Sequence, residues 1–412
     1  MASKRRGFEE GSGAQLAWVD ANVRHQIGLM RVAGSISRET LELLDMTETD
    51  IRHQIKDRLR RAKRRGTPAD VERLRGLLKE VREIRYGSWR KVRKLWLDRV
   101  GEVTRTESRT MKAILQTISP TSLDPKPLLL SDADRIVRQV PFEGHLLREW
   151  ADSIAATDVS RINGQIKVGM VQGEGISEIA RRVVGSASLR GRDGVTQVTR
   201  QQAEGIVRTA VNHTTNQARR EWFEENEEFF DIEMFLATLD SRTTKICASL
   251  DGERFPIGEG RIPPIHFGCR SQRVALLDPE PIGNRPMNPT TKKQLLRDYA
   301  KENGLEKIPR HRDDLPKGHK GAFDKFARTR VREMIGQVPT KVRYSTFLKR
   351  QPKWFQEDYL GKTKAKLFRE GMTLDQFTLS DGTELTLSDL AKNHAKTFRK
   401  AGLDPAAFAE AK

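Results

Sequence analysis

The chain has 412 residues, with 75 Lys and Arg against 56 Asp and Glu and a formal net charge of +19. This length exceeds that of a typical single core, so we expect two or three domains. The basic bias suggests an acidic partner, and nucleic acid is the usual large polyanion. Solvated basic helix faces account for the charge equally well, because a nucleic-acid site requires cations clustered on one face.

Two cysteines exclude a disulfide framework, and a charged fraction of 32% with a mean hydropathy of −0.63 argues against a membrane span. The first residues, "MASKRRGFEEGSGAQ", lack the apolar core of a secretory signal. We therefore expect a soluble protein that is made and kept in a reducing cytoplasm.

Apolar residues recur at helical spacing from residue 16 until Gly34, and again between residues 41 and 59, which predicts two or three amphipathic helices. The second set runs into a series of cations before Gly66. We interpret this series either as a solvated helix end that complements the helix dipole or as a nucleic-acid contact. The candidate contact residues are Arg58, Arg60, Arg61, Lys63, Arg64 and Arg65.

A helix start signal at Thr67 and Pro68 precedes a long apolar stripe, which resumes after a weak point at Gly87. We expect an extended helical hairpin, packed on neighbouring elements or on other subunits, with Trp89 and Trp96 in the core. Three prolines between residues 118 and 134 then mark the best domain boundary in the chain.

Helices are predicted within residues 142–184 and 199–229, and a short buried strand within residues 231–240. The stretch "NRPMNPTTKK" is interpreted as a loop, and the remainder to Lys412 as basic and helical. The predicted fold class is mainly α with a small α+β domain. The predicted domains are a helical arm (1–130), a central domain with short strands and a Cys/His loop (131–280), and a basic, mostly helical region (281–412).

Directly after the predicted strand, one segment combines cysteine, histidine, glycine and proline in the spacing C-x18-H-x2-C. It resembles the Mu F-type minor head protein, or head morphogenesis, family of tailed bacteriophages. The matching residues are Leu239 to Thr243, Cys247, Asp251, Gly252, Pro264, His266, Cys269 and Arg270. Similarity to the family extends over roughly residues 142–390, although Thr209-Ala210 stands where many members carry Thr-Glu.

This resemblance implies a minor head protein that acts in prohead assembly or DNA packaging. The implied partners are the portal, the major capsid or scaffold protein and, through the positive charge, double-stranded DNA. The implied location is the head interior of the virion near the portal, and the host cytoplasm during assembly. The alternative is a DNA-binding protein ejected with the genome, and a metal-dependent enzyme is a less favoured hypothesis.

The residues themselves leave three interpretations of the Cys/His loop open. Cys247, His266 and Cys269 supply three ligands suited to structural zinc, with Asp240 or Asp251 as the fourth. A disulfide between the two cysteines would suit a virion outside the cytoplasm. In the third interpretation the thiols are buried and free, and the loop is held by Asp240, Asp251, Gly252, Pro264 and Arg270, with Arg270 paired to one of the two acids.

Catalysis is not favoured by the sequence. It contains no H-E-x-x-H, no G-x-x-x-x-G-K-[ST], no G-x-S-x-G and no deaminase signature. Cys269 with His266 is the only formal nucleophile pair at the loop, and closeness in sequence says little about an oriented dyad. We therefore expect a protein that is not an enzyme. We assign it no certain cofactor, and structural zinc is the one cofactor considered.

Overall fold

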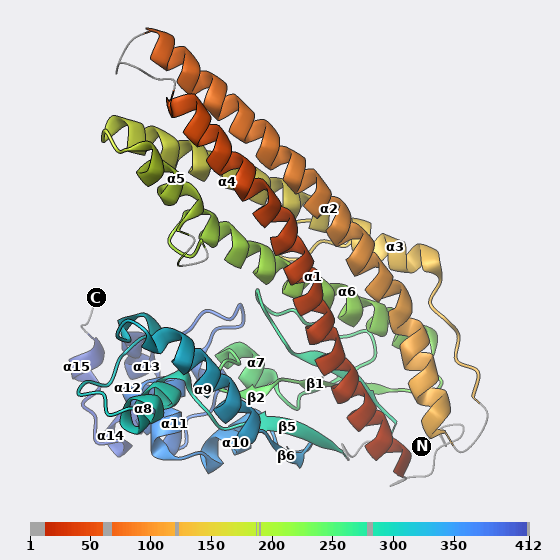
Figure 1. Cartoon of the computed structure of the whole chain (residues 1–412). Coiled ribbons are helices and arrows are strands. Elements are labelled where there is room, and N and C mark those ends of the chain that lie inside the picture. The colour runs from red at the N-terminus through yellow and green to blue at the C-terminus, as the bar shows by residue number, and fades with distance from the viewer. Residues whose placement is uncertain are drawn as a thin grey trace.

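The computed structural model describes residues 13–60, 68–119, 123–186, 188, 191–277 and 283–409. Within these residues the chain is mainly helical and contains two three-stranded sheets (Figure 1). The predicted fold class, with its extended N-terminal helices and small α+β part, is therefore confirmed.

Two long helices, α1 (Gly13–Arg60) and α2 (Pro68–Ile118), lie side by side along the molecule (Figure 1). The expectation of two or three helices before residue 60 is wrong, because α1 continues through Gly34. A glycine costs about 1 kcal/mol relative to alanine inside a helix. Burial of Ala33 and Ile36 beside it, in a core shared with α2, offsets that cost.

Helix α2 likewise continues through Gly87, and Trp89 and Trp96 are buried in its core-facing side as expected. Four further helices pack against this pair and complete the helical layer. They are α3 (Leu130–Gln139), α4 (Leu147–Val171), α5 (Ile176–Val184) and α6 (Thr196–Glu225). The proline-containing segment before α3 is non-helical in its described residues, as its sequence predicts.

The first sheet has the order β3-β1-β4 and is antiparallel throughout. Its strands are β1 (Ile232–Leu236), β3 (Arg254–Pro256) and β4 (Gln272–Leu276). Trp18 of α1 and Trp222 of α6 pack with the apolar residues of β1 and β4 in one cluster. The start of the long N-terminal helix therefore shares a core with the central sheet.

The second sheet has the order β2-β5-β6 and is mixed, with β2 parallel and β6 antiparallel to β5. Its strands are β2 (Leu239–Asp240), β5 (Asn284–Asn288) and β6 (Gly336–Pro339). The prediction of a loop at "NRPMNPTTKK" is wrong for its first five residues, which form β5. Pro286 argues against a strand in the sequence, because proline lacks the N–H group that a strand donates. In the structure, buried Arg285 stabilises β5 through hydrogen bonds to Asp251 and to the carbonyl of Val342.

Short helices form the rest of the chain and gather at the lower left of Figure 1. Their shared core contains aromatic residues such as Tyr344, Phe347, Phe355 and Phe377. The elements are α8 (Lys292–Glu302), η1 (Arg312–Asp314), α9 (His319–Glu333), α10 (Tyr344–Arg350), α11 (Lys353–Leu360), α12 (Lys362–Arg369), η2 (Asp375–Phe377), α13 (Leu387–Asn393), α14 (Ala395–Lys400) and α15 (Ala406–Ala409). The helical character predicted for this region is present.

Candidate functional site

The fold brings Cys247, His266 and Cys269 together. Cys247 lies on the short helix α7 (Lys245–Leu250), whereas the other two lie in the loop that leads into β4. Both cysteines are buried and free, and their sulfur atoms are 3.7 Å apart. One ligand atom from each of the three residues lies within 4.8 Å of the others.

The imidazole of His266 is half-buried, and its Nδ1 lies 2.8 Å from the backbone carbonyl oxygen of Phe267. Burial alone would lower the pKa of His266. The hydrogen bond to Cys269 and the negative charge of that thiolate outweigh burial, so the pKa is raised above its usual value of 6.5.

The two thiols also contact each other, at 3.7 Å between their sulfur atoms. The hydrogen bond between the two thiols lowers the pKa of Cys269 well below its usual range, even though burial opposes this. The same hydrogen bond, together with burial, raises the pKa of Cys247. The contact between the two thiols therefore shifts their pKa values in opposite directions.

Asp240 is held by Arg270 through two hydrogen bonds, at 2.6 Å and 2.7 Å from the guanidinium to the carboxylate oxygens. Burial acts to raise the pKa of Asp240, but the hydrogen bonds and charge of Arg270 outweigh it, so this pKa is lowered. Since Arg270 follows Cys269 directly, the pair fixes the end of the Cys/His loop against β2.

Asp251 is buried and binds a different arginine. Its carboxylate accepts hydrogen bonds from Arg285 at 2.7 Å and 2.5 Å, and from the backbone N–H groups of Ala237 and Tyr344 at 2.8 Å and 2.6 Å. Among the described residues neither Asp251 nor Asp240 joins the Cys/His cluster, so neither is placed as a fourth metal ligand.

Gly252 has a φ of +79°, and a Cβ atom at this position would lie 2.8 Å from the side chain of Arg343. Only glycine fits both the left-handed backbone and this close approach. Pro264 follows Pro263 through a cis peptide bond in the middle of the loop. Gly252 therefore occupies a turn directly after α7, and Pro264 lies in the loop that leads to β4.

Helix α6 supports the loop from the other side. The side-chain amide of Asn212 donates to the carbonyl of Cys269 at 2.8 Å, and the N–H of Gly268 donates to the Thr209 hydroxyl at 3.0 Å. Asn216 accepts a hydrogen bond from the N–H of Arg273 at 3.1 Å. The sequence interpretation missed these three residues. Buried polar side chains on the inner face of a helix were the available signal.

Ala210, which stands where many family members carry glutamate, is fully buried in the helical core. A charged side chain at this position would need a buried partner. The departure from the family pattern therefore falls at a packing position of this chain.

The predicted nucleic-acid contact lies at the end of α1, where the helix reaches Arg60. Arg58 and Arg60 belong to the last turn, and the structure describes only their backbone. Arg61, Lys63, Arg64 and Arg65 lie outside the described residues. Their contact with phosphate stays a prediction.

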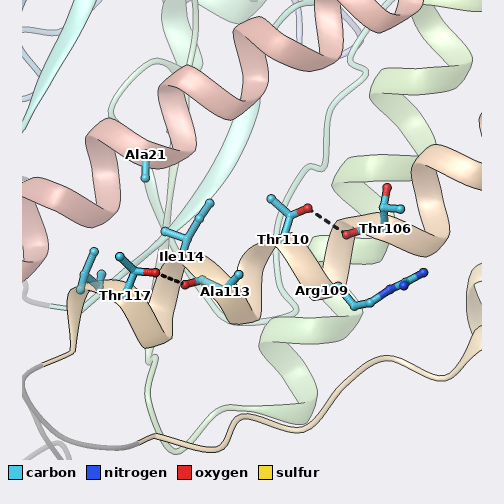
Figure 2. Close-up of a pocket in the computed structure, with 8 residues that line it drawn as sticks. Ala21, Thr106, Arg109, Thr110, Ala113, Ile114 and Thr117 are labelled. Carbon is cyan, nitrogen blue, oxygen red and sulfur yellow. Dashed lines mark hydrogen bonds between the residues drawn. The ribbon is translucent and has the colours of Figure 1, made fainter.

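An apolar groove of about 500 Å³ lies between the first part of α1 and the last turns of α2 (Figure 2). Its threonine hydroxyls are turned back onto their own helix. Thr110 donates to the carbonyl of Thr106 at 2.9 Å, and Thr117 to that of Ala113 at 2.7 Å. The groove surface is therefore formed mainly by methyl groups such as those of Ala21 and Ile114, and it shares no residue with the Cys/His cluster.

Residues 160–274 match the family model of the phage Mu protein F like proteins. The matched segment begins within α4 and ends within β4, so it contains α6, α7 and the entire Cys/His loop. The match confirms the family resemblance. It is shorter than the expected stretch of similarity, which was roughly residues 142–390. No curated protein and no solved structure matches the chain. Among its described residues, no helix is sufficiently long and apolar to cross a membrane.

Proposed function

We propose that this chain, a phage Mu F-like head protein over residues 160–274, is a minor head protein that acts in prohead assembly or DNA packaging. The family match is the observation that carries the proposal. The partners we assign are the portal and the major capsid or scaffold protein. The assigned location is the head interior near the portal, after assembly in the host cytoplasm.

We assign the protein no catalytic role. Asp240 and Asp251 are each held by an arginine, so neither is available as a general base beside the cysteines. The sequence also lacks the hydrolase and nucleotide-binding motifs considered above. These observations support a role in assembly through binding.

Contact with packaged DNA is supported by the net charge of +19 and by a stripe of cations on α9. Lys325, Arg328 and Arg332 are exposed and follow one another at intervals of three and four residues, which places them on one helix face. Within the described part of the chain, no salt bridge within 4.0 Å is found for any of the three. Their exposed charges can therefore neutralise phosphates.

Replacing Lys325, Arg328 and Arg332 together with glutamine is expected to weaken DNA binding and flatten its salt dependence. If each cation contacts one phosphate, the slope of log K against log salt decreases by up to about 2.7. Fluorescence anisotropy with linear duplex DNA over a range of salt concentrations measures this slope.

The matched control replaces Arg82, Arg90 and Lys91 of α2 with glutamine, which removes the same charge from another exposed surface. We expect this triple variant to keep the original slope. An equal decrease in both variants would show that overall charge alone governs binding, and would contradict a DNA contact at α9.

The second candidate function is a DNA-binding protein that leaves the head with the genome. The cation stripe on α9 favours it as much as it favours DNA contact during packaging. The two functions predict different stages at which the protein leaves the phage head. Retention on portal-containing proheads without DNA indicates assembly, whereas loss from virions together with the genome indicates ejection.

A further inference from the structure

We propose that Cys247, His266 and Cys269 bind one zinc ion, with a water molecule in the fourth position. The ion would join α7 to the loop before β4. This inference is independent of the DNA and portal contacts proposed above.

The separation of the two sulfur atoms fits a shared metal. With a Zn–S bond of about 2.3 Å and tetrahedral angles, two thiolates on one zinc ion lie about 3.8 Å apart. The observed separation is 3.7 Å. A disulfide would require the sulfurs to approach to about 2.05 Å.

The histidine presents the correct nitrogen. Nδ1 of His266 lies at hydrogen-bonding distance from the Phe267 carbonyl, which can only accept, so Nδ1 carries the proton. Nε2 is therefore the ring nitrogen left for a metal, which would displace any proton that Nε2 shares with Cys269. Metal-binding histidines commonly donate their second ring N–H to a carbonyl in this way, because it fixes the tautomer and the ring orientation.

Hydrogen-bond donors surround both sulfur atoms. Hydroxyl groups of Ser271 and Thr244 contact the Cys247 sulfur, and backbone N–H groups of Ile265 and Ser271 contact that of Cys269. The Thr244 hydroxyl is buried and makes no hydrogen bond in the described structure, so its proton is available to a thiolate on Cys247. Donors of this kind stabilise thiolates, which are the form that binds zinc.

The fourth position has no protein ligand among the described residues, since no further His, Cys, Asp or Glu joins the cluster. A half-exposed His266 leaves access for water at this side. The ion would connect α7 with a loop that is already bonded to α6 through Thr209 and Asn212. Its expected role is therefore to fix three elements relative to one another.

The test uses the full chain, purified under reducing conditions without chelator, dialysed and analysed for metal. We expect one zinc ion per chain and two thiols that react with a thiol reagent only after a strong chelator is added. Chelation is expected to lower Tm by roughly 5 to 10 °C. Cobalt(II) in place of zinc is expected to give the visible and thiolate charge-transfer absorption of a tetrahedral site.

Cys247→Ser and His266→Gln should abolish stoichiometric binding, whereas the control His311→Gln, at an exposed histidine, should retain it. Circular dichroism identifies variants that fail to fold, and thiol protection in the unmodified chain is independent of them. Two thiols that react freely without chelator would overturn the proposal. Absence of metal, with no reactive thiol even after the chain is unfolded in denaturant, would overturn it in favour of a disulfide. Undiminished zinc in Cys247→Ser would overturn the ligand assignment.

Discussion

Replacing Asp251 with alanine is expected to lower the free energy of unfolding by about 3 to 5 kcal/mol. The side chains of Asp251 and Arg285 are both almost fully buried. The carboxylate also binds the N–H groups of Ala237 and Tyr344, and Arg285 donates to the carbonyl of Val342. Truncation would therefore leave a buried guanidinium without its counter-ion and separate α7, β5 and the start of α10.

Urea unfolding of the purified chain at neutral pH measures this loss. The matched control is Asp313→Ala, because Asp313 also pairs with an arginine but its side chain is 83% exposed. Exposed ion pairs contribute about 0 to 1 kcal/mol, so the control should lie close to the unmodified protein. A loss below about 1 kcal/mol for Asp251→Ala would contradict the importance of this contact.

A comparable loss, about 3 to 5 kcal/mol, is expected for Asp158→Ala in the helical layer. Asp158 of α4 is buried and accepts hydrogen bonds from Arg85 and Trp89 of α2, at 2.5 Å and 2.9 Å, and from Thr199 of α6 at 2.8 Å. Arg85 also donates to the carbonyl of Leu44 on α1 at 3.1 Å. The carboxylate thus links three helices, and Arg85 extends the network to α1 as a fourth.

Asp152→Ala is the control for this second substitution, since Asp152 lies on the same helix and pairs with Arg93 across the same interface. Its side chain is 62% exposed, and we expect a change below about 1 kcal/mol. Urea denaturation followed by circular dichroism distinguishes the two variants. Equal stability of both would mean that the long N-terminal helices are not held through Asp158.

The residues of the Cys/His cluster could be predicted from the sequence because cysteine and histidine are rare in this chain. Cys247, His266 and Cys269 stand out in a chain with two cysteines, and the structure places them together. Hydrophobic periodicity similarly predicted the helical character of residues 71–100, which lie within α2, and the burial of Trp89 and Trp96.

Contacts between distant residues could not be predicted. Asp251 and Arg285 are 34 residues apart, and Asp158 and Arg85 are 73 apart, so no local pattern links them. The same limit explains the error at β5, because Arg285 stabilises that strand only through partners from other elements. The helix break expected at Gly34 is absent because the residues beside it pack against α2, and this tertiary packing overrides the low helix propensity of glycine.

Sedimentation of the purified chain with isolated portal and coat assemblies, in low and high salt and without DNA, tests the proposed function most directly. We predict that the chain sediments with portal or coat and that this association persists in high salt. A chain that binds linear duplex DNA in a salt-sensitive manner but neither assembly would contradict the role in head assembly. That result would favour the protein ejected with the genome.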